Sequence, residues 1–131
     1  MLNRLGKILV MLLAITLPTT DANSDANGDA VAVKIGDVFH RTMKHWNYSY
    51  TSLDTTKAGV ACMRWQHIDR KFLDDGIFKA IGFSYSVAKE EAAIRIATQG
   101  CEEMAKHYEV TDCTCEVVLV DDEVRVAPPQ E

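Results

Sequence analysis

The sequence lacks the short motifs that carry most enzyme chemistry. Its 131 residues contain no Gly-x-Ser-x-Gly nucleophile elbow, no His-Glu-x-x-His zinc pair and no glycine-rich phosphate loop. The few histidines are not spaced three or four residues apart, so no two of them share one side of a helix. The sequence therefore assigns no catalytic residue, no metal ligand and no cofactor, and it favours a non-enzymatic protein.

Positive charge and long apolar segments are also scarce. The 14 lysines and arginines are outnumbered by 19 acidic residues, which gives a formal net charge of −5. An acidic surface has no electrostatic reason to bind nucleic acid or anionic lipid. No apolar run approaches the roughly 20 residues that a transmembrane helix needs. We therefore expect no nucleic-acid partner, and no membrane span once the N-terminal segment is removed.

The longest apolar run is Ile8–Leu17, whose ten residues carry no charge. Two basic residues precede this run, a proline follows it, and small-x-small cleavage sites end at Ala22 and Ala26. This order is typical of a secretory signal peptide. We predict a signal peptide over residues 1–26, cleaved after Ala22 or Ala26, and a mature protein that is secreted or periplasmic.

The rest of the sequence predicts a single domain over residues 27–127 and a flexible tail over residues 128–131. Apolar residues at helical spacing predict a first helix over about 30–45 and a longer helix over about 88–108. Alternating or continuous apolar residues predict strands at 46–50, 60–65, 77–85, 115–120 and 123–126. For the second of these, a helical turn lined by Trp65, Ile68 and Phe72 is an open alternative.

The order of these elements predicts an α+β fold. In this fold an antiparallel sheet has a long helix packed on one face, and two disulfides stabilise it. A ferredoxin-like βαββαβ arrangement is the alternative. That arrangement requires residues 31–35 to form a strand instead of the start of a helix.

All four cysteines lie after the predicted signal peptide, and an even number in a small exported chain favours disulfides. Cys113 and Cys115 are two residues apart on an extended segment, so their Cα atoms would lie about 6.6 Å apart, near the limit for bridging each other. Cys101 lies on the inward stripe of the long helix, and Cys62 lies on another predicted strand. We favour the pairs Cys101–Cys115 and Cys62–Cys113, and the crossed pairing stays open as the alternative.

Residues 76–126 resemble a known family. The strand GIFKAIGFSYS, the helix AKEEAAIRIATQGCEE and the strand CEVVLVDDEV are similar to a module of small exported bacterial proteins described as a domain of unknown function. Glu90–Ala92 match the start of the family's helix, Cys101 matches its end, and Cys115–Asp121 match the last strand. The resemblance implies that Cys101 bonds Cys115, and it carries no catalytic residues. The other two cysteines are additions to the family's pattern.

An aromatic set is the clearest candidate for a binding face: Trp46, Tyr48, Tyr50 and Trp65. Exposed aromatic side chains are suited to bind a glycan, a peptide or a protein. The competing interpretation is that these rings fill the core of a small domain.

These observations predict an exported, non-enzymatic binding or accessory protein, such as an inhibitor or a secreted effector. We expect its partner to be a protein or an envelope polymer. The alternative function is a small exported thiol-redox protein or enzyme that uses Cys113 and Cys115.

Overall fold

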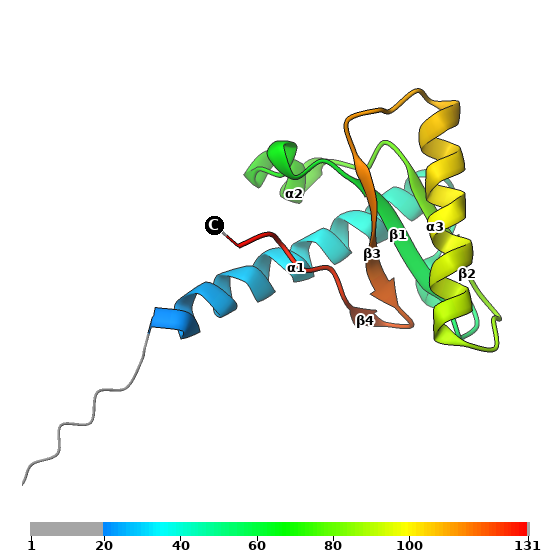
Figure 1. Cartoon of the computed structure of the whole chain (residues 1–131), viewed down its shortest axis with the longest axis horizontal. Coiled ribbons are helices and arrows are strands. Elements are labelled where there is room, and N and C mark those ends of the chain that lie inside the picture. The colour runs from blue at the N-terminus through cyan, green and yellow to red at the C-terminus, as the bar shows by residue number, and fades with distance from the viewer. Residues whose placement is uncertain (1–19, 131) are drawn as a thin grey trace, which may run out of the picture.

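The computed structural model describes residues 20–130 of the chain (Figure 1). The apolar run Ile8–Leu17 of the predicted signal peptide lies outside the described residues, and so does Glu131 of the predicted tail. Among the described residues, no helix combines the length and the apolar composition that crossing a membrane requires.

Helices and strands alternate along the described part of the chain. In chain order they are α1 (Thr20–His45), η1 (Tyr50–Ser52), β1 (Ala58–Met63), η2 (Trp65–His67), α2 (Arg70–Asp75), β2 (Ile81–Ser84), α3 (Glu90–His107), β3 (Thr114–Val120) and β4 (Glu123–Val124). The first helix begins earlier than predicted, so that both candidate cleavage points, Ala22 and Ala26, lie in its first turns. The strand predicted over 77–85 is shorter, because only Ile81–Ser84 pair with a neighbour as β2.

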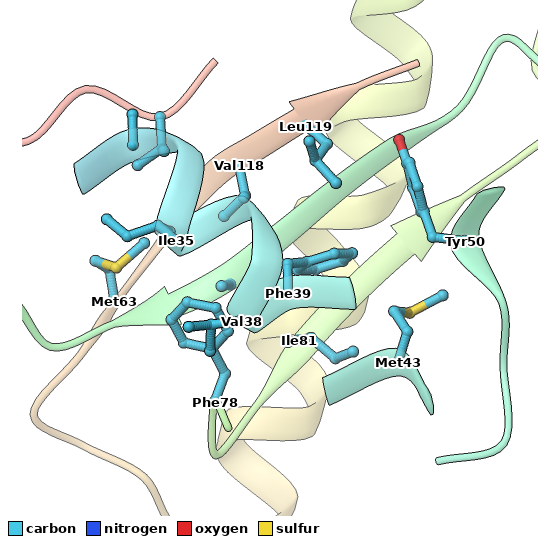
Figure 2. Packing of buried hydrophobic residues seen from close by; sticks show 13 residues of the cluster. Ile35, Val38, Phe39, Met43, Tyr50, Met63, Phe78, Ile81, Val118 and Leu119 are labelled. Atoms are coloured by element: carbon cyan, nitrogen blue, oxygen red, sulfur yellow. The ribbon is translucent and has the colours of Figure 1, made fainter. Parts of the chain in front are cut away.

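The four strands form one antiparallel sheet in the order β2-β1-β3-β4. Helix α3 packs on one face of this sheet, and α1 crosses the other face (Figures 1 and 2). The predicted α+β fold, with an antiparallel sheet and a long helix packed on one face, is confirmed. The ferredoxin-like alternative is wrong, because residues 31–35 lie within α1.

Strand β1 is central and buried along its whole length. Successive side chains of a strand point to opposite faces. Ala58, Val60 and Cys62 accordingly lie in the core beside α3, whereas Ala61 and Met63 lie in the core beside α1. Since most of these side chains are small, the helices on both faces can approach the sheet closely.

The contact between α3 and β2 depends on Gly82. A Cβ atom at this position would lie 1.9 Å from the carbonyl oxygen of Ala97 and 2.3 Å from the amide nitrogen of Cys101. Gly100 of α3 faces the same strand residue but leaves more space. A Cβ atom at Gly100 would meet only the Gly82 Cα atom, at 3.5 Å, which is an ordinary contact distance. The backbones of helix and strand therefore touch, which fixes the position of α3 beside the edge strand.

The larger core lies between α1 and the sheet (Figure 2). Side chains of α1 at helical spacing point toward the strands: Ile35, Val38, Phe39 and Met43. They pack among buried side chains of the sheet and of the following segment, which include Tyr50, Ile81, Val118 and Leu119. This packing covers the sheet face that α3 leaves open.

Residues 46–50 do not form the predicted strand, because α1 ends there in a capping turn. Asn47 has a φ of 67°, in the left-handed region that asparagine tolerates better than most residues. The Tyr48 amide donates to the Met43 carbonyl at 2.9 Å, and the Asn47 amide donates to the Lys44 carbonyl at 2.9 Å. This is the hydrogen-bond pattern of a Schellman motif. The alternation of aromatic and polar residues here marks a helix end.

Helix α3 ends in the same way. Glu109 has a φ of 56°, and the Val110 amide donates to the Ala105 carbonyl at 2.8 Å. The residue just before the left-handed position is aromatic in both helices, Trp46 after α1 and Tyr108 after α3. Their ring centroids lie 6.2 Å apart. The C-terminal ends of α1 and α3 therefore meet through an aromatic pair.

Candidate functional site

Two disulfides join the cysteines, as predicted. Cys62 is bonded to Cys113 and Cys101 to Cys115, with Cα–Cα distances of 5.2 Å and 6.1 Å. These are the favoured pairs and not the crossed ones. The first bridge joins β1 to the segment before β3, and the second joins α3 to β3. Because Cys113 and Cys115 each bond a different partner, the Cys113–Cys115 pair of the redox hypothesis is absent from this fold.

The four aromatic residues of the predicted binding face do not share one surface. Trp46 and Tyr48 are 40 % and 50 % exposed. Tyr50 is fully buried in the core, and its placement in the face is therefore wrong (Figure 2). Trp65 is partly buried against the same core, and its Nε1 donates to a Glu116 carboxylate oxygen at 2.8 Å. Only Trp46 and Tyr48 remain candidates for contact with a partner.

Tyr50 belongs instead to a buried cluster around Lys57, which is only 2 % exposed. The Lys57 ammonium donates to the carbonyls of Tyr50 and Leu53 at 2.9 and 3.0 Å, and it lies 3.5 Å from an Asp122 carboxylate oxygen. Burial raises the pKa of the Tyr50 hydroxyl far above its ordinary value, and the nearby Asp121 and Asp122 add to this. The cluster joins the loop before β1 to the turn after β3, which is a structural role.

Aromatic side chains, most of them exposed, gather where β2 forms an edge of the sheet, and Phe83 among them is partly buried against the core. We call this group the β2-edge surface, and its members are Trp46, Tyr48, Phe83, Tyr85 and Tyr108. Ring centroids are 5.0 Å apart for Tyr48 and Phe83, 6.5 Å for Phe83 and Tyr85, and 6.2 Å for Trp46 and Tyr108. Four of these residues are among the six large hydrophobic residues that are exposed within residues 28–130. This clustering sets them apart from single exposed apolar side chains, which are normal on any protein.

Three separate parts of the chain build this surface. Phe83 and Tyr85 are two residues apart and stack nearly parallel, with 19° between their ring planes. The capping turn of α1 places Tyr48 beside Phe83 of β2 and Trp46 beside Tyr108, which lies in the capping turn of α3. The sequence prediction missed Phe83, Tyr85 and Tyr108 as members, because only the strand order makes β2 an edge. Asn47 was a usable signal for the capping turn of α1, because asparagine tolerates the left-handed conformation found there.

Basic side chains border one end of the β2-edge surface. Lys44 and His45 occupy the last turn of α1, and Lys106 and His107 occupy the last turn of α3. The rings of His45 and Trp46 are 5.4 Å apart, and those of His107 and Tyr108 are 4.7 Å apart. Three exposed glutamates, Glu102, Glu103 and Glu109, lie in or directly after the same end of α3, so this border carries charges of both signs.

A small cavity lies elsewhere, between the end of β1 and α2. Its volume is about 150 Å³, and its walls include the side chains of Cys62, Ile68, Phe72 and Phe78. Arg64 lies at its rim and donates two hydrogen bonds to Asp112, which hold the pKa of that carboxyl below its ordinary value. Small-molecule sites usually measure about 300–1,000 Å³. The cavity is therefore a weaker candidate than the β2-edge surface.

No metal centre is formed within residues 20–130, where no three His, Cys, Asp or Glu side chains come close enough together to hold an ion. The β2-edge surface offers a partner contact with aromatic rings, with charged groups of both signs and with the strand backbone.

Comparison with protein-family models, with curated proteins and with solved structures gives no match to this chain.

Proposed function

We propose that the protein is a non-enzymatic binding protein that works outside the cytoplasm and contacts its partner through the β2-edge surface. The observation that carries this proposal is the exposure of clustered aromatic rings from three separate parts of the chain. Aromatic residues are enriched among the side chains that contribute most to protein binding, because they bury a large area with few rotatable bonds. A surface of this kind is unfavourable in water unless a partner covers it.

Three further observations support an exported role. The two disulfides form and persist in oxidising compartments such as the periplasm and the extracellular space. The sequence of the N-terminal segment has the order of a signal peptide. Residues 76–126 resemble a module of exported bacterial proteins, which fits the same location.

The proposal predicts that loss of two exposed rings abolishes partner capture. A Tyr48→Ser/Tyr85→Ser variant removes half-exposed side chains, so its fold should survive while its contact surface is lost. The mature chain and the variant are immobilised and exposed to the extracytoplasmic fraction of the source cells. Retained material is then compared by mass spectrometry. We expect at least one component that the wild type retains and the variant does not.

A Val33→Ser variant is the control, since it also removes an exposed apolar side chain, from α1. Val33 lies thirteen residues before Trp46, which is about 20 Å along the chain direction of the helix. This control should retain the same component as the wild type. Equal retention by all three proteins, or no specific retention by the wild type, would contradict the proposed function.

A further inference from the structure

We infer that the partner is a polypeptide segment in extended conformation, which pairs with the free edge of β2 as a fifth strand. This inference rests on the proposed function and names the class of partner. The sheet order would then become partner-β2-β1-β3-β4.

The backbone of β2 is suited to this pairing. The Cys62 amide donates to the Ala80 carbonyl at 2.9 Å, so these two residues form a hydrogen-bonded pair. Such pairs alternate with non-bonded pairs along an antiparallel ladder. Gly82 and Ser84, which lie opposite Val60 and Ala58, therefore turn their backbone groups toward β1. Phe83 turns its amide and its carbonyl away from β1, toward the free edge.

Ile81 supports this direction. Its amide donates to the Met104 sulfur atom at 3.4 Å, on the side away from β1. A thioether sulfur is a weak hydrogen-bond acceptor. A peptide carbonyl at this place would be a stronger acceptor for the Ile81 amide. The same peptide could also pair with the amide and the carbonyl of Phe83, two residues further along β2.

Side chains of an added strand would meet the β2-edge rings. Strand addition draws affinity from backbone hydrogen bonds and specificity from pockets for alternate side chains. Every second side chain of the incoming segment would lie beside Phe83 and Tyr85. The Tyr48 ring would be a further contact, because its centroid lies 5.0 Å from that of Phe83. Since β2 has only four residues and offers few backbone bonds, these rings must supply much of the affinity.

A random library of displayed linear peptides, each about ten residues long, tests this inference when selected on the mature chain. We expect selected peptides to alternate apolar with polar residues. Their dissociation constants should rise at least about tenfold with Tyr48→Ser/Tyr85→Ser.

Methylation of single peptide amides separates strand addition from other modes of binding. In the bound peptide every second amide would face β2. A methyl group on one of these amides removes a main-chain hydrogen bond and keeps the peptide from approaching β2, so each such methylation should weaken binding at least about tenfold. Methylating the amides between them should change little. Peptides that need Tyr48 and Tyr85 but are insensitive to methylation would overturn the inference and leave the proposed function standing. If no selected peptide depends on these rings, the inference is overturned as well, whereas the proposed function is judged by its own capture experiment.

Discussion

A Gly82→Ala variant is expected to lose more than about 3 kcal/mol of unfolding free energy, or to fail to fold. The added methyl group would lie 1.9 Å from the Ala97 carbonyl oxygen and 2.3 Å from the Cys101 amide nitrogen. Both are backbone atoms, so no side-chain rotation relieves the clash, and α3 must move away from β2. Overpacking a core typically costs about 1–3 kcal/mol, and this site lacks the usual means of relaxation. Urea unfolding followed by circular dichroism measures the loss.

Gly100→Ala is the control for this prediction, because it adds the same methyl group to the other partner of the same contact. At Gly100 the new carbon meets only the Gly82 Cα atom, at an ordinary 3.5 Å. Alanine is also the better helix former by about 1 kcal/mol. We therefore expect Gly100→Ala to be neutral or stabilising. If both variants lost similar stability, the close backbone contact between α3 and β2 would be refuted.

The second large effect is expected from the disulfides, and the two should differ. Cys62 and Cys113 are 51 residues apart in sequence, whereas Cys101 and Cys115 are 14 apart. A bridge stabilises by restricting the unfolded chain, and the effect grows with the length of the closed loop. Replacing Cys62 and Cys113 with alanine should cost about 4 kcal/mol, and replacing Cys101 and Cys115 should cost about 3 kcal/mol. Small domains have only about 5–15 kcal/mol in total, so each loss is severe.

Non-reducing peptide mapping of the exported wild type is the control for the disulfide series. It should yield one fragment linked through Cys62 and Cys113 and another linked through Cys101 and Cys115. A link between Cys113 and Cys115 would restore the redox hypothesis. If removing the Cys101–Cys115 bridge cost more stability than removing the Cys62–Cys113 bridge, loop length could not explain the difference between the two bridges.

Long, regular elements could be predicted from the sequence. Helix α3 was predicted within two residues of its ends, because its apolar stripe is regular and acidic residues occupy its first turn. The two disulfides followed from the even number of cysteines and from their positions on predicted elements. Each of these conclusions depends on local pattern or simple counting, which a single sequence contains.

The candidate site could be predicted only in part, because it depends on contacts between distant segments. Trp46 and Tyr48 stood out by composition, yet Tyr50 has the same local pattern and is buried. The capping turn at Asn47 decides the difference, since it turns the chain so that Tyr50 enters the core. Tyr85 and Tyr108 gained a role only when the strand order placed β2 at an edge and the two helix ends together.

The binding role of the β2-edge surface is tested most directly by amide hydrogen exchange of the wild-type chain, with and without the component that it captures. Exchange reports protection of backbone amides segment by segment. The account predicts slower exchange on binding in two segments, residues 46–48 and residues 81–85. Protection confined to other segments, such as α2 beside the small cavity, or unchanged exchange in both predicted segments, would contradict it.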